Sequence, residues 1–262
     1  MIDEFTVIPV LKNYTIHYSI CTIVNNWQEY DEMKHSFISK GFVSETEYLV
    51  IDNTGQNNLD AYKAIRRFLK DATGKYIIIV HQDVRCIDDI EKLSHTLKEL
   101  EHLDPLWSVC GNAGGNGYKN FIFNLENNGK VKKTAGLPAR VTSLDENLLI
   151  IKNDCQLTVS ADIESFHFYG TVLCIISDFL GYHCYVIDFM VAHLSAGNLK
   201  HMDEYKPTFI GTYGRKFRDR FIQTTCTKFY LSDSASKNRL YNKGFIFFWI
   251  KAANRFGNIF KR

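Results

Sequence analysis

The chain has 262 residues, of which 45% are hydrophobic, and its formal net charge is +2. This length and composition suit either one large domain or one domain with an appendage, with enough apolar residues to build a core without disulfides. The near-neutral charge excludes the strongly basic balance of many nucleic-acid-binding proteins, so we expect no nucleic-acid partner. No apolar run approaches the ~20 residues that span a bilayer, and the residues after Met1 lack the pattern of an export signal.

The seven cysteines form no CxxC pair, and most of them lie inside apolar runs. An odd number of cysteines in such positions is typical of reduced, buried thiols rather than of a disulfide framework. We therefore expect a cytoplasmic protein.

The first two thirds of the chain alternate strand and helix patterns. Apolar, β-branched runs predict strands at 18–24, 47–51, 76–80 and 107–110, and 3.6-residue spacing predicts helices at 27–40, 59–69 and 88–103. Repeated strand–helix units of this kind specify an α/β fold with a mostly parallel sheet flanked by helices.

The later pattern is less regular. Residues 111–120, rich in Gly and Asn, predict a loop, and shorter strands are expected at 130–133, 148–151 and 185–191. Residues 166–180 predict a helix that ends at Gly181. From residue 205 the pattern is helical and basic, so we expect a catalytic domain at 1–199 and a helical C-terminal extension at 200–262.

Polar side chains follow three of the predicted strands. Asn25 follows the first strand, Asp52 closes the second, and His81, Gln82 and Asp83 follow the third. Ligands of open α/β sheets bind beyond the carboxyl ends of the strands, where a carboxylate can hold a divalent cation. The alternative is structural, with Asp83 capping the helix near residue 88 and Asp52 closing a tight turn.

The order of these blocks resembles the bacterial family 2-like group of nucleotide-sugar glycosyltransferases, which have the GT-A (Rossmann-like) fold. The matching blocks are SICTIVN at 19–25, YLVIDN at 48–53, YIIIVHQD at 76–83, FHFYGTVLC at 166–174, Gly181-Tyr182 and HLS at 193–195. The resemblance covers roughly residues 18–197.

The resemblance implies roles for several residues. The backbone around Thr22, Val24 and Asn25 would lie along the nucleotide, and Asp52 would bind its base, which is usually uracil. His81, Gln82 and Asp83 stand at a DxD-type metal motif. Asp83 and His193 would hold Mn²⁺ or Mg²⁺ on the diphosphate. The alternative for His193 is a packed histidine at a strand end, and His167 would contact the diphosphate or acceptor or else belong to the core.

One departure from the family pattern concerns the general base that an inverting transferase requires. The family pattern resembles YDxDLC, whereas this chain reads YGTVLC at 169–174, with Gly170 and Val172 in place of the acids. Three possibilities stay open: a base from elsewhere, a shifted alignment, or a protein that binds donor but transfers poorly. We expect Asp162 to act as substitute base unless it is only a helix N-terminal acid. The other candidates for the base nearest in sequence are Asp145, Glu146 and Glu164, of which Asp145 and Glu146 would lie near the acceptor or donor sugar.

The sequence thus predicts a metal-assisted, inverting glycosyltransferase that moves a hexose from a nucleotide-sugar, most often UDP-linked in such families. The expected acceptor is a surface glycan such as lipopolysaccharide or capsule, or a lipid-linked precursor at the inner face of the cell membrane. The basic, aromatic residues 243–262 suit a peripheral membrane contact, and the alternatives are core packing or homo-oligomer formation. A catalytically impaired nucleotide-sugar-binding protein is the alternative function. A sugar nucleotidyltransferase would need a Gly-rich phosphate loop after the first strand, where Asn25, Asn26 and Trp27 stand instead.

Overall fold

The computed structural model describes residues 13–55, 58–117, 120–127, 129–195, 199–223 and 228–246. The chain divides into two compact units, Met1–Met202 and Asp203–Arg262.

The first unit is built on a seven-stranded sheet with the strand order β2-β1-β3-β11-β5-β12-β9. Five of these strands run in one direction, and β9 and β11 run in the other. The mostly parallel sheet expected from the sequence is therefore confirmed. The strands are β1 (Tyr18–Val24), β2 (Thr46–Asp52), β3 (Tyr76–Val80), β5 (Trp107–Gly111), β9 (Ala139–Val141), β11 (Leu148–Lys152) and β12 (His183–Val186).

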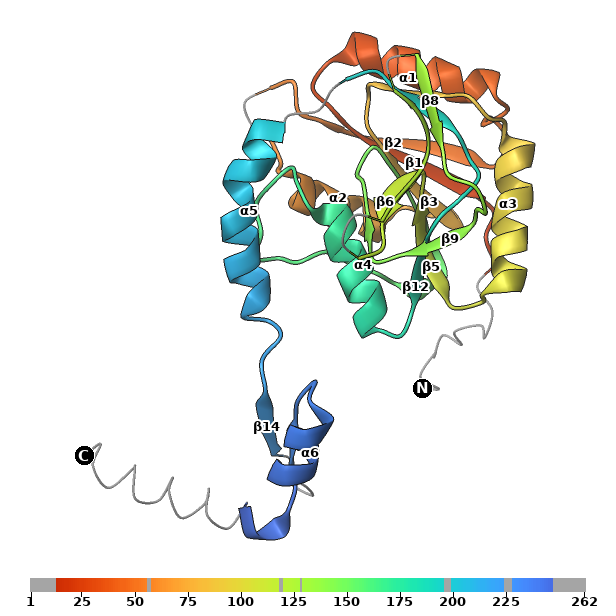
Figure 1. Ribbon diagram of the computed structural model, residues 1–262. Helices are drawn as coiled ribbons and strands as arrows, with labels where there is room; N and C mark the ends of the chain where they lie inside the picture. The colour runs from red at the N-terminus through yellow and green to blue at the C-terminus, as the bar shows by residue number, and fades with distance from the viewer. Residues whose placement is uncertain are drawn as a thin grey trace, which may run out of the picture. The chain divides into compact units, whose positions relative to one another are not determined.

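Four helices surround this sheet (Figure 1), and they are α1 (Trp27–Ser39), α2 (Ala61–Asp71), α3 (Ile90–Leu103) and α4 (Tyr169–Phe179). The buried sides of α1 and α3 join one apolar cluster with alternate residues of the sheet, among them Ile78 and Val80. The intervening residues Ile77 and Ile79 are also buried and point to the opposite face, where α2 packs on β1 and α4 on β5 and β12. The helices begin and end within a few residues of the sequence prediction, and Gly181 follows α4 with a φ of 84°.

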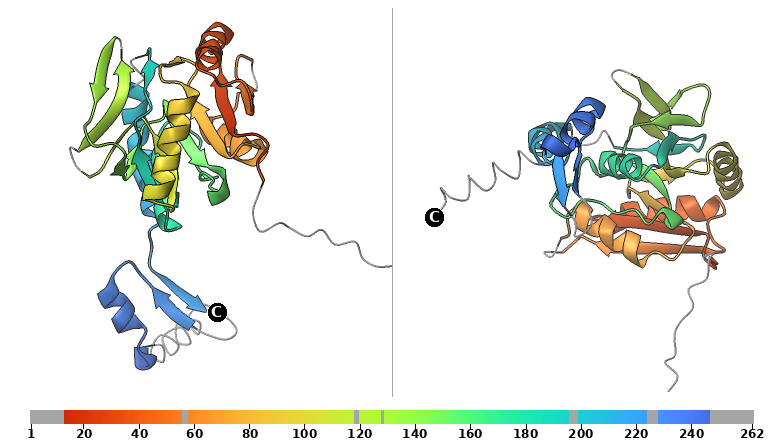
Figure 2. Two further views of the ribbon diagram at one scale, coloured as in Figure 1. Left: turned by 90° about the vertical axis from the view of Figure 1, so that its right-hand side faces the viewer. Right: turned by 90° about the horizontal axis from the view of Figure 1, so that it is seen from below.

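A second, six-stranded sheet has the order β10-β6-β7-β13-β4, with β8 paired to β7. The β7–β8 hairpin extends away from the seven-stranded sheet and is drawn in light green in the left view of Figure 2. The strands are β4 (Val84–Cys86), β6 (Ala113–Gly115), β7 (Phe121–Asn127), β8 (Lys130–Lys133), β10 (Ser143–Leu144) and β13 (Val191–His193).

Two predictions for the first unit were wrong in part. The segment 111–120 is not all loop, because Ala113–Gly115 forms β6 and pairs with β7. The single strand expected at 185–191 is two strands, β12 and β13, which belong to different sheets. The chain changes sheet at Asp188, which lies between the two strands. Its carboxylate accepts hydrogen bonds there from Asn124, Lys92 and Lys133, and burial in a sheet without such partners would be unfavourable.

The second unit combines most of α5 (Leu199–Gly214) with β14 (Arg220–Gln223), β15 (Lys228–Leu231) and α6 (Ala235–Tyr241). The prediction of a wholly helical extension was therefore wrong, because β14 and β15 form an antiparallel hairpin. Asn242 fixes α6 to this hairpin through hydrogen bonds with both backbone groups of Tyr230. None of the helices within the described ranges has the length and apolar character that a membrane crossing requires. Residues 247–262, the main part of the expected membrane-contact segment, lie outside the described residues.

The six cysteines in the described part of the chain are buried and unpaired, as expected. Cys226 lies outside the described residues. A short 3₁₀ turn at Asn153–Cys155 ends β11, and Asn153 there donates to the backbone oxygen of Gly74.

The packing of α1 on the sheet predicts a large cost for truncating Phe37, which is 0% exposed. Phe37→Ala should lower the free energy of unfolding by ~3–5 kcal/mol, because it removes a buried ring and leaves a cavity. Urea denaturation followed by circular dichroism measures this change. The matched control is Phe179→Ala, whose ring is 77% exposed and whose loss should change stability by less than about 0.5 kcal/mol. Equal losses in the two variants would contradict the assigned core.

Candidate active site

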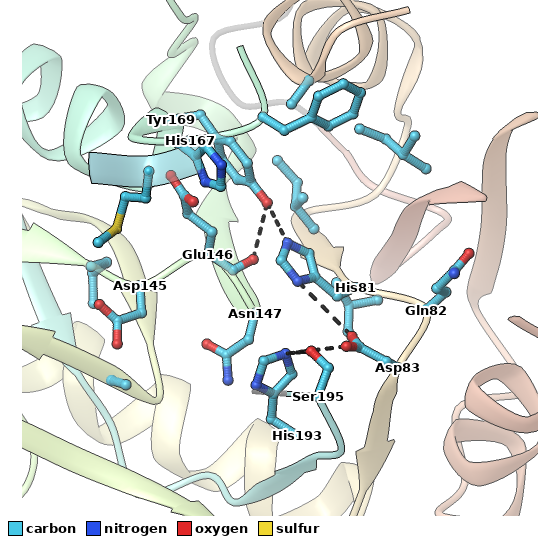
Figure 3. A pocket seen from close by; sticks show the side chains of 18 of the residues that line it. His81, Gln82, Asp83, Asp145, Glu146, Asn147, His167, Tyr169, His193 and Ser195 are labelled. Carbon is cyan, nitrogen blue, oxygen red and sulfur yellow. Dashed lines mark hydrogen bonds and ion pairs between the residues drawn. The ribbon is translucent and has the colours of Figure 1, made fainter. Parts of the chain in front are cut away.

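The carboxyl ends of β1 and β3 open into a pocket of about 960 Å³. Its walls also include residues of β7, β8 and β10, the turn before β11, and the segment that leads into α4. Polar and titratable side chains of this pocket are drawn in Figure 3. A concave site with convergent polar groups at the carboxyl edge of an α/β sheet is the usual form of a ligand site.

The direction of β11 decides which side chains enter this pocket. β11 pairs with β3 in antiparallel register, with Leu148 opposite Val80. The residues before β11 therefore lie beside those that follow β3, and the backbone N–H of His81 donates to Asn147 O at 3.1 Å. Asp145, Glu146 and Asn147 reach the same edge as His81 and Asp83 by this route.

His81, Asp83 and His193 form a cluster whose ligand atoms all lie within 4.8 Å of one another. Asp83 stands directly before β4, and His193 ends β13 opposite Val84, so the pairing of these two strands brings the side chains together. The backbone N–H of Leu194 donates to Asp83 O at 3.1 Å and fixes this end of the ladder. His193 Nε2 lies 3.4 Å from Asp83 Oδ2, and His81 Nδ1 lies 4.0 Å from Asp83 Oδ1.

The Asp83 carboxylate is held in its ionised form. Burial raises its pKa, but hydrogen bonds from His193 and Ser195, together with the nearby imidazoles of His193 and His81, outweigh burial and hold the pKa far below its ordinary value. Oδ1 is buried, and within the described ranges no group donates a hydrogen bond to it. A buried anionic oxygen of this kind suits a cation, and the pair of imidazoles supplies further nitrogen ligands.

His81 is neutral over the physiological range. Burial against the pocket wall lowers its pKa to about 4, and the attraction of Asp83 does not restore it. Its Nε2 lies 2.7 Å from the Tyr169 hydroxyl, which donates to Glu146 O at 3.1 Å. With that hydroxyl proton committed to Glu146 O, Nε2 of His81 carries the imidazole proton and Nδ1 keeps its lone pair toward Asp83. The residues present therefore fit a divalent cation.

Glu146 is the second carboxyl group with an unusual environment. Burial raises its pKa from 4.5 to about 8, although backbone N–H groups at the start of α4 favour the anion. One of these groups is Gly170 N, which donates to Glu146 Oε1 at 3.4 Å. The neighbouring Asp145 faces the pocket, and partial burial by the pocket walls raises its pKa as well.

The first strand and the loop after it line the pocket at only some of the predicted positions. Thr22 and Val24 are buried within β1 and do not line the pocket, whereas Asn25 does. Gln82 also lines the pocket, but its amide is engaged: its oxygen accepts from the backbone N–H groups of Asn25 and Asn26, and its nitrogen donates to Glu29. Gln82 thus holds the start of α1 against the end of β3.

Asp52 is exposed and does not line the pocket, whereas its neighbour Asn53 does. The carboxylate accepts from Thr54 N at 2.9 Å and Thr54 Oγ1 at 2.6 Å, and these bonds lower its pKa. The turn interpretation of Asp52 is therefore realised in the structure, while a contact with a base stays a prediction.

The three expected catalytic residues are separated in the structure. Asp145 and His167 line the pocket, but Asp162 does not. Glu164 is exposed and pairs with Lys63, so it also lies outside the lining. No role was predicted for Tyr169, Asn147 or Ser195, and Glu146 was one of several candidates for the general base. The sequence does predict a strand directly after Glu146, at 148–151. The direction of this strand, which brings Glu146 to the pocket, depends on its antiparallel pairing with β3.

The raised pKa of Glu146 predicts a specific dependence of stability on pH. The folded protein holds this proton up to about pH 8, whereas the unfolded chain releases it near 4.5. Raising the pH through this window therefore lowers the free energy of unfolding, by on the order of 2–4 kcal/mol for a partly accessible group. Urea denaturation at both ends of the window should show this loss in the wild-type protein and a smaller loss in Glu146→Gln. Parallel curves for the two proteins would show that Glu146 titrates normally.

Comparisons with known proteins place the chain in a family but do not supply an activity. No protein-family model matches it. The structure of S. aureus TarS 1-349 in complex with UDP is 13% identical with a TM-score of 0.49 and covers 69% of this chain and 61% of its own. The mannosyltransferase PcManGT from Pyrobaculum calidifontis, in complex with GDP-Man and Mn²⁺, is 10% identical with a TM-score of 0.46 and covers 68% of this chain and 57% of its own. At these low scores the two likenesses add nothing to the description of the site.

A closer relation exists in sequence. The protein named ATP synthase subunits region ORF 6, from Fuscovulum blasticum, is 31% identical over an alignment of 188 residues, and the match covers 68% of this chain and 76% of that protein. Its name states a region and a reading frame rather than a reaction. The chain belongs to the same family as the ATP synthase subunits region ORF 6 protein of Fuscovulum blasticum.

Proposed function

We propose that the protein is a metal-assisted glycosyltransferase that uses a nucleotide-sugar donor. The observation that carries this proposal is the cluster of His81, Asp83 and His193, in which an ionised carboxylate keeps one buried oxygen without a hydrogen-bond donor among the described residues. The cluster lies in a pocket large enough for a nucleotide-sugar, at the carboxyl edge of the sheet. The order of the sequence blocks at 19–25, 48–53, 76–83 and 193–195 supports the same donor class.

The residues present suggest how such a donor would be held. Asp83, His193 and His81 would hold Mn²⁺ or Mg²⁺, which would neutralise the negative charge of the diphosphate leaving group. Nitrogen ligands from two imidazoles favour Mn²⁺ over Mg²⁺. Asn25 lines the pocket at the end of β1, where its side chain can hydrogen-bond a ribose or a base. Asn53 also lines the pocket, but its amide is paired with both backbone groups of Leu59.

The finer parts of the proposal rest on the sequence resemblance. They are a UDP-linked hexose as donor, inversion at the anomeric carbon, and an acceptor hydroxyl on a lipopolysaccharide, a capsule glycan or a lipid-linked precursor. A position at the inner face of the cell membrane would suit such an acceptor. The basic residues near the C-terminus, including Lys243, would support that contact, and a homo-oligomeric contact of the same segment is the alternative.

A second candidate function is favoured by one specific observation. Gly170 and Val172 replace the acids of the family pattern, and both positions are buried in α4. The loss of both acids is expected in a protein that binds a nucleotide-sugar without transferring it. Such a protein would bind the donor tightly, and neither transfer nor donor hydrolysis would be detectable.

Calorimetric titration of the purified protein with UDP and with GDP, with and without Mn²⁺, tests the donor site. We expect binding of at least one of the two nucleotides, strengthened by Mn²⁺. Asp83→Asn should weaken the Mn²⁺-dependent binding at least about tenfold, because it removes the anionic ligand but keeps the side-chain shape. The matched control is Asp31→Asn, an exposed carboxylate on α1 outside the pocket, which should bind as the wild-type protein does.

The possible contrary results are distinct. If neither UDP nor GDP binds under any condition, the nucleotide-sugar proposal is wrong. If a nucleotide binds equally well without Mn²⁺ and in Asp83→Asn, the donor site stands and the metal site is wrong.

A further inference from the structure

The first turn of α4 has an unusual cap. Phe168 precedes the helix with a φ of 67°, a left-handed conformation that is uncommon outside glycine, and its side chain accepts no hydrogen bond from the helix. The acceptor comes instead from Glu146, in the turn before β11, whose carboxyl oxygen meets Gly170 N. A carboxyl group distant in sequence thus occupies the N-terminal end of α4 and faces the pocket.

Gly170 provides the space for this approach. A Cβ atom at position 170 would lie 2.5 Å from Leu144 O and 3.4 Å from Glu146 Cγ. The first distance is a collision with backbone, so no acidic side chain fits at 170 while the Glu146 turn is in place. The absence of an acid at 170 and the presence of Glu146 are two parts of one packing arrangement.

Position 172 does not supply a proton acceptor either. The Val172 side chain is 0% exposed and does not line the pocket, whereas its neighbours Tyr169 and Thr171 do. Neither position 170 nor position 172 therefore offers a proton acceptor to the pocket.

A second feature beside Glu146 indicates where a hydroxyl-bearing ligand would bind. The next residue, Asn147, lines the pocket, and its amide oxygen is buried and accepts no hydrogen bond within the described residues. A buried acceptor without a donor suits a hydroxyl group of a ligand. The amide oxygen of Asn147 would accept a hydrogen bond from one hydroxyl group of the ligand. Glu146 is the residue directly before Asn147 in the chain.

We propose that Glu146 is the general base of this protein and takes over the role of the acids missing from positions 170 and 172. This inference rests on the proposed glycosyl transfer. In the reaction, the acceptor oxygen forms a bond to the anomeric carbon while the bond from that carbon to the diphosphate oxygen breaks. The electron pair of the broken bond leaves with the nucleoside diphosphate, and the proton of the acceptor hydroxyl passes to the Glu146 carboxylate. A divalent cation held by Asp83, His193 and His81 would neutralise the charge of the leaving diphosphate and would take no part in the proton transfer.

The electrostatic setting supports this role. A carboxyl group with a pKa near 8 is a much stronger base than an ordinary glutamate, and it stays partly ionised at neutral pH. The titratable groups that line the same pocket from the surrounding elements are Glu29, His81, Asp83, Lys132, Asp145, His167, Tyr169 and His193. Asp145 is the one whose charge raises the pKa of Glu146.

A purely structural role for Glu146 as the cap of α4 is the rival hypothesis. Glu146→Gln separates the two roles, because the amide oxygen of glutamine can still accept from Gly170 N–H but cannot take a proton at neutral pH. A cap role predicts that Gln is tolerated. A base role predicts that it is not.

The experiment measures nucleoside diphosphate release from UDP-glucose, UDP-N-acetylglucosamine and GDP-mannose in the presence of Mn²⁺, with water as the acceptor. UDP and GDP affinities are measured on the same samples by calorimetry. We expect Glu146→Gln to lower the release rate at least about a hundredfold with unchanged nucleotide affinity. Glu164→Gln is the matched control, because it is an exposed glutamate outside the pocket and should release product at the wild-type rate. Asp162→Asn tests the other acid expected from the sequence.

Each result decides between the two roles. Equal rates in wild type and Glu146→Gln, or a comparable loss in Asp162→Asn, would overturn the assignment of Glu146. A wild-type protein that binds nucleotide and Mn²⁺ but releases no diphosphate from any of the three donors would overturn it too, and would leave the binding-protein function. Absence of nucleotide binding altogether would mean that the proposed function itself has failed.

Discussion

The antiparallel placement of β11 between β3 and β5 is the constraint on which the candidate site depends. In an all-parallel arrangement the residues before β11 would lie at the amino edge of the sheet, far from the end of β3. Because Leu148 pairs with Val80, Asn147 O instead accepts from His81 N, and Glu146 enters the pocket. The second antiparallel pairing that shapes the site is between β4 and β13, and it brings His193 close to Asp83. Two antiparallel pairings thus assemble a site that parallel βα units alone would leave incomplete.

Much of the fold followed from local patterns. The strands at 18–24 and 76–80 were predicted to the residue, because a short, continuous β-branched run is typical of a strand that is buried on both faces. The failures have a common cause, since strand direction and sheet membership depend on distant partners. The run from 185 to 191 looks like one strand, yet its halves pair in different sheets, and only Asp188 marks the change. The β14–β15 hairpin was missed because its basic, aromatic residues also suit a helix.

The site could be predicted where a single polar or charged residue at the end of a strand is enough to identify a ligand. Asp83 and His193 were identified in this way and come together in the structure. The structure also rules out the helix-cap interpretation of Asp83, because Asp89 caps α3 by accepting from Lys92 N. Gln82 illustrates the limit of such reasoning: it lies in the pocket as expected, but the backbone of the loop after β1 occupies its amide oxygen. The sequence alone can place a polar side chain at the carboxyl edge of the sheet. It does not show which neighbouring groups occupy the hydrogen-bonding positions of that side chain.

Asp83 and Glu146 show how one pocket gives two carboxyl groups opposite properties. Both are desolvated, and desolvation alone raises the pKa of each. At Asp83 two imidazoles and a serine outweigh burial, so the group stays ionised and suits a permanent cation ligand. At Glu146 the N-terminus of α4 offers only backbone N–H groups, and Asp145 adds a like charge, so burial prevails. A group that exchanges its proton near neutral pH suits proton transfer rather than metal binding. In the proposed glycosyl transfer, these two environments suit Asp83 to cation binding and Glu146 to proton transfer, and the missing Cβ of Gly170 leaves the space in which the Glu146 turn approaches α4.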